Sequence, residues 1–268
     1  MKPRADIGVF GGSGFYKFFK NAEEIAIRTP FGKPSGKVTL SEIGGKNVAF
    51  LPRHGVHHEF PPHMVPYRAN MRAFKDLGIK RVMGPTAVGI LNPDMQPGDL
   101  VFCDQFVNFT TGRRDTFYDG PYTTHVSTAD PYCPEMRKVG IEAATKLGLN
   151  SHPSGTVVVI QGPRFSTRAE SKFFSRQGWD VINMTQFPEV VLARELEMCY
   201  LNISVATDYD AGLEGNPDVK PVSHEEVIKV FDKNIGNLKE LIAEIVRNLP
   251  DRRSCGCGSA LGHARMSA

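Results

Sequence analysis

The sequence predicts one α/β domain whose central sheet, mostly parallel or mixed, is flanked by helices. Short runs rich in β-branched residues alternate along the chain with stretches of helical periodicity, a pattern typical of α/β proteins. The chain has 268 residues, of which 41% are hydrophobic, so it can bury one large core but hardly two. We therefore expect a single domain over residues 1–250, followed by a loosely attached tail over residues 251–268.

The predicted strands are short, and one pair forms a hairpin that turns at Gly44-Gly45. In chain order the strand stretches are DIGVF (6–10), KVTLSEIGGKNVAFL (37–51, the hairpin), IKRVMG (79–84), GDLVFCDQFV (98–107), GTVVVIQG (155–162), WDVINM (179–184) and LNISVA (201–206).

Helical periodicity predicts four helices between these strands and a fifth after them. The first four lie around Tyr67–Leu77, Pro134–Leu147, Thr167–Gln177 and Glu189–Met198. In the fifth, Ser223 and Glu226 form a capping box at the start, and Pro250 ends the helix. Its apolar stripe consists of Val227, Phe231, Leu238 and Ile242.

Composition argues against several classes of protein. The formal net charge is only +3 and the basic residues form no long tract, which disfavours a nucleic-acid binder. No apolar stretch is as long as a membrane span, and MKPRADIGVF lacks the apolar region of a signal peptide. Five cysteines are too few, and odd in number, for a secreted disulfide framework. We expect a cytoplasmic protein with neither a membrane nor a nucleic acid as partner.

The stretch ATDYDAG, residues 206–212, places Asp208 and Asp210 two residues apart, directly after a predicted strand. If the extended backbone continues, both side chains point to one side, because a strand alternates its faces. Two carboxyl groups that share a site do not both ionise readily, so one pKa rises and that acid can donate a proton. A polar turn is the alternative, since Asp and Gly are turn residues.

Groups that can bind an anion follow three of the predicted strands, where ligands of α/β sheets commonly lie. They are Ser13 in the turn GGSGF (11–15), Arg53 and His54 after the hairpin, and Thr86 and Ala87 after IKRVMG. Backbone amides, a guanidinium and hydroxyl groups are suited to phosphate. The turn is not a dinucleotide-binding motif, because Lys17 stands where the last glycine is required, and a plain tight turn is the alternative.

The loop RHGVHHEFPPH (53–63) is rich in histidine and raises the question of a metal site. Its candidate ligands are His54, His57, His58, Glu59 and His63. Their spacing matches no common zinc pattern, so we predict no metal site there.

Motifs spread along the whole chain resemble those of a known family. They are GGSGFY, TPFGKPSG, LPRHGVHHEFPPHMVPYRANM, TAVG, QPGDLVFCDQFVNFTTGR, TFYDGP, GPRFSTRAES, NMTQFPEVVLARE and ATDYD. Over about residues 6–250 the chain resembles the S-methyl-5'-thioadenosine phosphorylases of the trimeric purine nucleoside phosphorylase superfamily. The resemblance implies a phosphorylase-type fold with a distorted central sheet. It also implies that inorganic phosphate replaces the purine on C1' of a 5'-methylthioribose, without a cofactor, in a homotrimer or a dimer of trimers.

Position by position, the resemblance implies a role for each candidate residue. Phosphate would be bound by Ser13, Arg53, His54, Thr86, Ala87 and Thr185. The base and sugar would lie against Phe165, Ser166, Asn183 and Met184, with His224 at the 5' group of the sugar and His125 reaching into the neighbouring subunit's site. Phe165 and Met184 as core residues, Asn183 as a turn residue and His224 as a solvent-exposed helix residue are the alternatives.

The aspartate pair fits this chemistry. Cleavage of the ribosidic bond puts negative charge on the purine, and a neutral carboxylic acid can donate a hydrogen bond to N7. Asp208 would be that acid, and Asp210 its partner or the acceptor for the exocyclic amine. The pair would favour 6-aminopurines over 6-oxopurines, because an unpaired buried polar group is unfavourable. His224 would bind a 5'-hydroxyl, which adds adenosine to the expected substrates.

The tail SCGCGSALGHARMSA contains Cys255 and Cys257, only two of the four ligands that a zinc site usually needs. It resembles the Cys-x-Cys endings of some archaeal relatives, in which the cysteines form disulfides. Cys133 and Cys199 fall where such relatives form a further pair. We expect reduced thiols, because intracellular disulfides are uncommon outside hyperthermophiles.

Three other functions stay open at this point. The first is a broader purine nucleoside phosphorylase that also accepts 6-oxopurine or methylthioinosine substrates. The others are a nucleosidase, which uses water in place of phosphate, and a nucleoside-binding module without catalysis. The anion-binding groups favour phosphate over water, and a dependence of the rate on phosphate distinguishes these functions.

Overall fold

The computed structural model describes residues 4–11, 22–121, 123–212, 221–262 and 264. Its elements are β1 (Ile7–Gly11), β2 (Glu23–Ile25), β3 (Val38–Ile43), β4 (Lys46–Pro52), α1 (Tyr67–Asp76), β5 (Arg81–Ile90), β6 (Leu100–Val101), β7 (Gln105–Phe109), α2 (Pro134–Lys146), β8 (Ser151–His152), β9 (Thr156–Ile160), α3 (Arg168–Arg176), β10 (Val181–Asn183), α4 (Gln186–Glu195), β11 (Cys199–Asp208) and α5 (His224–Asn248), with 3-10 helices at Pro62–Met64 and Gly256–Ser259.

The strands form one mixed sheet that branches at β5. The strand order is β2-β3-β4-β1-β5-β10-β9-β7, while β11 pairs with β5 and β6, and β6 pairs with β8. β5 runs parallel to β1 over its first residues and antiparallel to β10 over its last, and it runs parallel to β11 along most of its length. The change of neighbour along β5 distorts the sheet, as the sequence predicts by resemblance.

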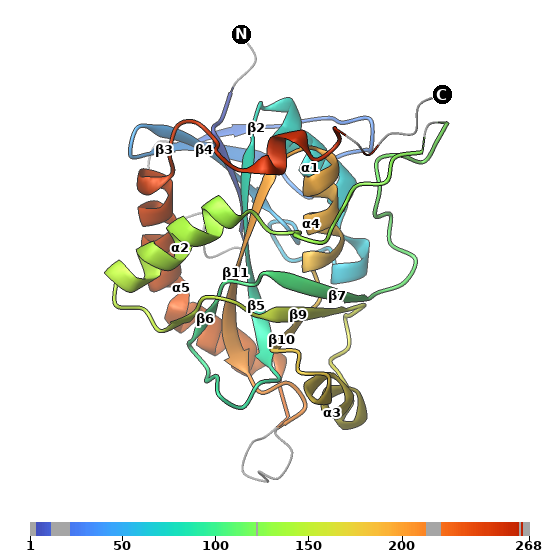
Figure 1. Cartoon of the computed structure of the whole chain (residues 1–268), viewed down its shortest axis with the longest axis vertical. Helices are drawn as coiled ribbons and strands as arrows, with labels where there is room; N and C mark the ends of the chain where they lie inside the picture. Colours follow the sequence, from blue (N-terminus) through green and yellow to red (C-terminus); the bar gives the residue numbers. More distant parts are fainter. Residues whose placement is uncertain (1–3, 12–21, 122, 213–220, 263, 265–268) are drawn as a thin grey trace.

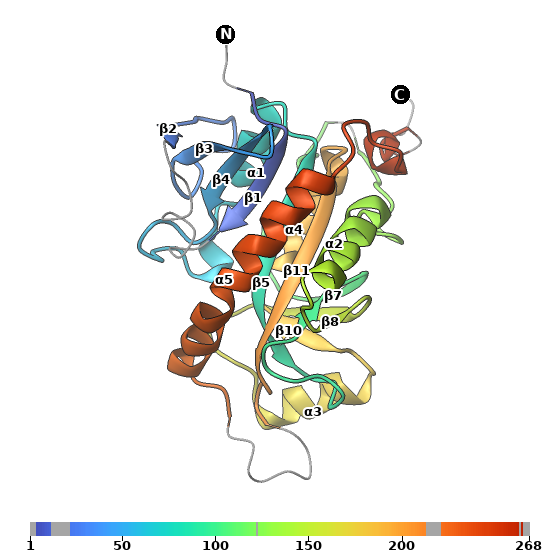
Figure 2. The same cartoon turned by 90° about the vertical axis from the view of Figure 1, so that its left-hand side faces the viewer.

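Helices cover both faces of the sheet, so the molecule has a core on each side. α2 and α5 lie on one face, and α1 and α4 lie on the other (Figures 1 and 2). β11 supplies both cores because its side chains alternate. Cys199, Leu201, Ile203 and Val205 point to the α2 and α5 side, and Tyr200 and Ala206 point to the α1 and α4 side.

The predicted elements are largely confirmed. All five helices are present, and the hairpin turns at Gly44 and Gly45, both with positive φ. The predicted strand over residues 98–107 is wrong, because it splits into β6 and β7, which pair with different parts of the branched sheet. β2 and β8 are unpredicted strands of two or three mostly polar residues, too short to show an apolar alternation.

The caps differ in one detail from the sequence prediction. Ser223 caps α5, and its Oγ accepts from the backbone N–H of Glu226 at 3.2 Å. The complete reciprocal capping box is at the start of α3, between Thr167 and Glu170.

The prediction of a loosely attached tail is wrong for the described part of residues 251–268. Cys257 is buried, Arg253 donates to the carbonyl of Glu197 at 2.8 Å, and Ser254 Oγ donates to Glu135 at 2.6 Å. These bonds fasten the segment to the ends of α4 and α2, and the division at residue 250 stays a prediction.

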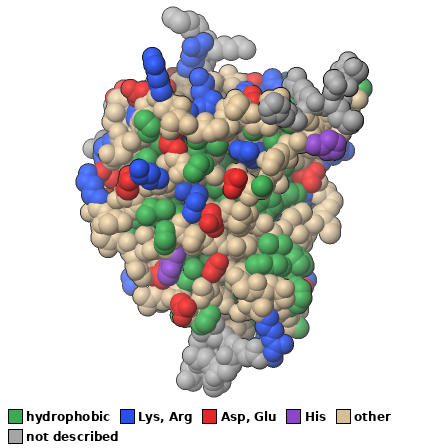
Figure 3. All heavy atoms as spheres, in the orientation of Figure 1, with side chains coloured by type: hydrophobic (Ala, Val, Ile, Leu, Met, Phe, Trp, Pro, Cys, Tyr) green, Lys and Arg blue, Asp and Glu red, His purple; other side chains and the backbone are tan. Residues whose placement is uncertain are grey.

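The described helices include none that is both long and apolar enough to cross a bilayer. On the face shown in Figure 3, acidic and basic side chains are mixed with one another and with apolar ones.

Candidate active site

The aspartate pair lies where β5 and β11 end side by side. A β-bulge between Ala206 and Asp208 shifts the register so that Asp208 pairs with Gly89 of β5. A Cβ on Gly89 would lie 3.1 Å from the Cβ of Asp210 and 3.2 Å from Oδ1 of Asp208. Gly89 therefore leaves the space that the two aspartates occupy.

Of the two alternatives for this stretch, continued extended backbone and a polar turn, the structure shows the turn, and the two aspartates lie close together. β11 ends at Asp208, and the next residues turn, with Gly212 N–H donating to the carbonyl of Tyr209 at 2.8 Å. Asp210 has a φ of +48° in this turn and is buried. A buried non-glycine residue at positive φ is strained, and such residues cluster at functional sites.

Asp208 is held by two neutral donors. Thr207 Oγ1 donates to Oδ2 at 2.7 Å, and the backbone N–H of Asp210 donates to Oδ1 at 2.8 Å. Burial raises the pKa of Asp208 to about 6, against the opposing effect of these hydrogen bonds. A carboxyl group with this pKa is partly protonated near neutral pH and can act as an acid.

Burial also raises the pKa of the Asp210 carboxyl group, against the opposing effect of the nearby hydroxyl groups of Ser171 and Ser166. By the geometry of hydrogen bonding, Oδ2 of Asp210 and Oγ of Ser166 are buried atoms without a partner among the described residues. Arg168 fixes the turn by donating to the carbonyl of Ala211 at 3.1 Å. Unsatisfied buried polar atoms are unfavourable, so this side of the pair is suited to a ligand that supplies hydrogen bonds.

Arg53 is a buried cation whose position is fixed by a carboxylate. Its Nε and Nη2 donate to the two oxygens of Glu189 at 2.6 and 3.1 Å, and its Nη1 donates to the carbonyl of Pro85 at 2.9 Å. Tyr200 also donates to Glu189, at 2.7 Å. Two of the five guanidinium N–H groups have no part in these three bonds, and they can bind an anion.

The environment of His54 favours the neutral imidazole near pH 7. Burial lowers its pKa to about 4. Its Nδ1 lies 2.8 Å from the carbonyl of Phe60, and its ring stacks on that of His58 at 4.4 Å. Because Nδ1 must donate to a carbonyl, Nε2 is the acceptor.

Thr86, in the middle of β5, is the centre of a hydrogen-bond network. Its Oγ1 accepts from Asn202 Nδ2 at 3.1 Å and from Asn183 Nδ2 at 3.4 Å. Both bonds leave its own hydroxyl proton free to donate to a ligand. Thr185 is the buried N-cap residue of α4, two residues after Asn183 at the end of β10. The carbonyl of Pro85, which accepts from Arg53, belongs to the residue directly before Thr86, so the cation lies close to Thr86 along β5.

Four further residues are predicted for the site, and the structure describes three of them. Ala87 follows Thr86 in β5, and Met184 packs against Gly162, where a Cβ would lie 2.6 Å from its Sδ. Phe165 is 37% exposed, in the same loop as Ser166. Ser13 lies outside the described residues.

The two outlying histidines are both exposed. His224 is the first residue of α5. Burial lowers the pKa of His58, and the charge of His224 is the next largest cause, which shows that His224 lies near the histidine loop. His125 is not brought to the aspartate pair; its backbone N–H donates to the carbonyl of Ala264 at 2.8 Å.

Sequence reasoning missed Glu189, Tyr200 and Asn202, which are all buried. A signal for Glu189 is its place in the apolar run FPEVVLA, because a carboxylate inside an apolar helix face needs a buried partner. Among the described residues, the histidine loop forms no group of three or more possible metal ligands.

Comparison with known proteins places the chain in a family. The model of the phosphorylase superfamily matches residues 6–247. The chain is 53% identical over 255 residues to the S-methyl-5'-thioadenosine phosphorylase of Thermococcus kodakarensis, covering 95% of this chain and 97% of the relative. It is 47% identical over 271 residues to the purine nucleoside phosphorylase of Streptomyces coelicolor, covering 97% and 96%.

Solved structures of two methylthioadenosine phosphorylases have the same fold as this chain. The methylthioadenosine phosphorylase of Schistosoma mansoni, in complex with adenine, superposes with a TM-score of 0.90 at 33% identity, covering 98% of this chain and 99% of the other. A methylthioadenosine phosphorylase from an antarctic soil metagenomic library gives a TM-score of 0.93 at 37% identity, covering 100% and 94%.

Proposed function

The chain belongs to the phosphorylase superfamily, and from this we propose that it catalyses the phosphorolysis of S-methyl-5'-thioadenosine. The products are adenine and 5-methylthioribose 1-phosphate, which makes the enzyme a pentosyltransferase. Inorganic phosphate is the second substrate, and the proposed reaction uses no cofactor.

The observation that carries this proposal is the buried pair of aspartates with raised pKa values. As the bond between C1' and N9 breaks, the purine takes the electron pair and becomes more basic at N7. Asp208, when protonated, donates its proton or a hydrogen bond to N7. The unpaired Oδ2 of Asp210 is available to accept from the exocyclic amine of adenine.

The phosphate side of the proposal rests on the groups around Thr86. The two remaining N–H groups of Arg53 and the hydroxyl of Thr86 are donors for a phosphate oxygen. His54 offers an acceptor through Nε2, which matches the protonated oxygen of monohydrogen phosphate. Phosphate bound there stabilises the positive sugar and then attacks C1'. Ser13, Ala87 and Thr185 complete the proposed phosphate site, with Phe165, Ser166, Asn183 and Met184 against the base and sugar.

A panel of nucleosides, assayed with and without phosphate, tests the proposal. We expect methylthioadenosine and adenosine to release adenine at a rate that rises with phosphate and saturates, and we expect inosine to react roughly tenfold to a hundredfold less efficiently. A rate independent of phosphate would identify a nucleosidase. Tight binding of the nucleosides without turnover would identify a binding module.

A second candidate is a purine nucleoside phosphorylase of broader specificity. It is favoured by the 47% identity to the enzyme of that name from Streptomyces coelicolor. The exposed His224 near His58 also supports a 5'-hydroxyl substrate, because a histidine can bind a hydroxyl but gains nothing from a methylthio group. Equal use of inosine and adenosine would favour this candidate.

We further propose a cytoplasmic homotrimer, or a hexamer built from two trimers. The exposed position of His125 is compatible with its contribution to a neighbouring subunit's site. Residues 1–250 supply every residue of the proposed site, so we regard them as the catalytic domain and residues 251–268 as an appendage.

A further inference from the structure

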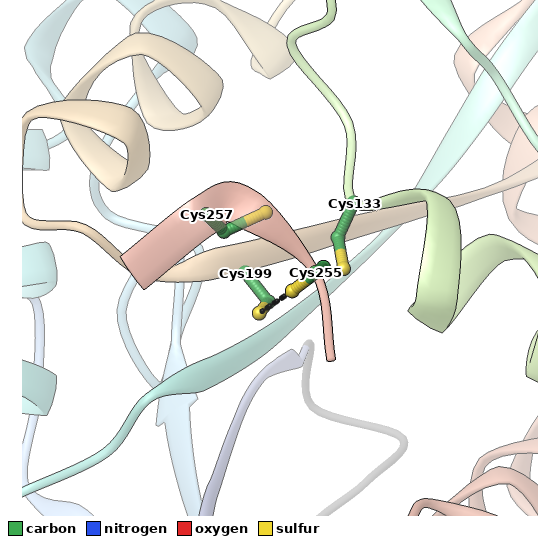
Figure 4. A group of neighbouring side chains, drawn as sticks. All are labelled: Cys133, Cys199, Cys255 and Cys257. Atoms are coloured by element: carbon green, nitrogen blue, oxygen red, sulfur yellow. Dashed lines mark hydrogen bonds between the residues drawn. The ribbon is translucent and has the colours of Figure 1, made fainter. Parts of the chain in front are cut away.

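Four of the five cysteines converge at one place in the fold, far apart though they are in the sequence. The sulfur atoms of Cys133, Cys199, Cys255 and Cys257 all lie within 4.8 Å of one another (Figure 4). Cys133 is the N-cap residue of α2, Cys199 is the first residue of β11, and the other two belong to the tail. All five cysteines of the chain are free in this structure.

We propose that these four thiols, as thiolates, bind a structural Zn²⁺ ion that fastens the tail to the catalytic domain. A tetrahedral ion with Zn–S bonds of about 2.3 Å separates its sulfur ligands by about 3.8 Å. The sulfur atoms of Cys199 and Cys255 are 3.4 Å apart, and no two sulfur atoms of the four are more than 4.8 Å apart. The preformed cluster therefore spans the spacing of a four-thiolate site. The sequence argument against zinc fails because it counted only the two thiols of the tail.

The burial of the cluster favours a structural ion over a catalytic one. Cys133, Cys199 and Cys257 are buried and Cys255 is half-buried. Structural zinc sites are closed by four protein ligands, whereas a catalytic site keeps one position for water or substrate. None of the residues that we assign to the nucleoside or phosphate site belongs to the cluster, so this proposal is independent of the proposed function.

The surroundings supply the positive charge that such a site needs. Binding of Zn²⁺ to four neutral thiols releases four protons and leaves a complex with a net charge of −2. Arg253 Nη1 lies 3.9 Å from the Sγ of Cys199, and the backbone N–H of Met136 donates to the Sγ of Cys133 at 3.5 Å. The second contact is at the N-terminus of α2, where the helix dipole also favours negative charge.

A buried arginine beside the cluster has one N–H group without a hydrogen-bond partner among the described residues, which is a further indication. Arg81 is the register partner of Cys199 on the neighbouring strand β5. Its Nε is buried and has no hydrogen-bond partner among the described residues, although its Nη2 donates to Glu135 at 3.1 Å. A buried N–H without an acceptor is unfavourable. A negatively charged metal–thiolate group next to it reduces that penalty.

Polar contacts hold together the segments that carry the cysteines. Glu135 accepts from the backbone N–H and the hydroxyl of Ser254, at 2.7 and 2.6 Å, while it also binds Arg81. This carboxylate lies two residues after Cys133 and Ser254 lies one residue before Cys255. Such bonds orient the ligands, as in metal sites with a well-defined surrounding shell.

The test is a Co²⁺ titration of the full-length chain, purified with a thiol reductant in the absence of oxygen and stripped of metal by a chelator. Tetrahedral Co²⁺ bound by thiolates has intense visible and charge-transfer absorption. We expect these bands to saturate at about one Co²⁺ per chain and to disappear when Zn²⁺ displaces it. Metal analysis of the protein as isolated should find zinc at a similar ratio.

Two variants distinguish the role of the four clustered cysteines from that of Cys103. Zn²⁺ should raise the Tm of the metal-free wild-type chain, because it binds the folded state. In the double variant Cys255→Ser and Cys257→Ser we expect the Co²⁺ bands to be lost and the Tm to be unaffected by Zn²⁺. Cys103→Ala is the matched control, because Cys103 faces Ser204 at 3.6 Å outside the cluster, and it should keep both responses. Methylthioadenosine turnover or circular dichroism shows that each sample is folded.

Three outcomes would overturn the proposal. The first is a reduced, folded wild-type chain that develops no thiolate–Co²⁺ absorption. The second is persistence of that absorption in the double variant. The third is alkylation of the isolated protein, denatured without reductant, at a single cysteine, since this would show that the four thiols form two disulfides instead.

Discussion

Asp208 is buried beside neutral donors, whereas the equally buried Arg53 is paired with a carboxylate. Thr207 and the amide of Asp210 bind Asp208, and burial raises its pKa to about 6. Arg53 is equally buried, but Glu189 binds it through both oxygens and keeps its pKa above the usual range despite burial. The two environments fit the proposed roles, which are an acid for Asp208 and a permanent cation for Arg53.

The acid role of Asp208 predicts a pH dependence with a definite sign. The protonated fraction falls as the pH rises through about 6, so kcat/KM for methylthioadenosine at saturating phosphate should decline between pH 6 and pH 8. Asp208→Asn should lower kcat roughly hundredfold and remove this decline. Steady-state kinetics across this pH range measures both effects. Unchanged turnover in the variant would exclude Asp208 as the acid.

Glu189 is a positioning residue for Arg53. Glu189→Gln leaves a buried guanidinium without its counter-charge, which should lower the free energy of unfolding by about 3–5 kcal/mol and raise KM for phosphate. Urea denaturation and phosphate kinetics measure the two effects. The control is Glu24→Gln, which breaks an exposed pair with Lys37 and should change stability by less than about 1 kcal/mol. Similar losses in both variants would contradict the assignment.

His224 is predicted to distinguish the 5' group of the sugar. His224→Val removes one hydrogen bond to a 5'-hydroxyl, which is worth about 0.5–1.5 kcal/mol. We therefore expect kcat/KM for adenosine to fall by up to about tenfold, while methylthioadenosine is used as well as before or better. If both substrates respond equally, His224 does not contact the 5' group.

At the scale of elements, the ends of β5 and β11 create the site. The bulge before Asp208 and the turn after it bring both aspartates over Gly89. β5 also carries Thr86, and Pro85 beside it binds Arg53. A single pair of parallel strands therefore connects the purine side of the proposed site with its phosphate side.

Gly89→Ala tests this arrangement. Its Cβ would approach Ile182 Cγ2 to 2.9 Å and the Cβ of Asp210 to 3.1 Å, so the pair must move. We expect kcat to fall at least tenfold, because a misplacement of about 1 Å at a catalytic group has effects of that size. Gly236→Ala in α5 is the control, since nothing lies within 4 Å of its Cβ and alanine favours a helix. Normal kinetics of Gly89→Ala in a folded protein would refute the packing argument.

At the scale of the whole molecule, two cores enclose the sheet while part of the surface stays apolar. Phe109 at the end of β7 and Phe173 on α3 are 43% and 49% exposed, and their rings lie 6.3 Å apart. Exposed aromatic side chains that lie together commonly belong to contacts between proteins. This feature is compatible with the proposed trimer.

The proposed trimer or hexamer predicts a defined molecular mass in solution. Light scattering after size exclusion should give three times the chain mass of 29.6 kDa, or twice that value for a hexamer. His125→Ala should lower kcat/KM without changing this mass, because the residue lies outside the site of its own chain. A fully active monomer would contradict the prediction.

The sequence by itself determined the alternation of strands and helices, because short β-branched runs and helical periodicity are local properties of the chain. It also led to the proposal of Asp208, Arg53, His54 and Thr86 as site residues, since ligand-binding residues of an α/β protein follow or end its strands and the motifs resemble those of one family. It left the turn at Asp210 undecided, because Asp and Gly residues are compatible with both a strand end and a turn, and only the folded backbone shows the positive φ.

Only the tertiary structure decided which distant residues meet. Glu189 is 136 residues from Arg53 in the sequence, and Cys133 and Cys199 lie far from the two cysteines of the tail. Composition and periodicity carry no information about such pairs, because contacts of this range depend on the order of strands in the branched sheet and on where the tail packs. The partner of a buried charge and the convergence of four distant thiols therefore appear only once the chain is folded.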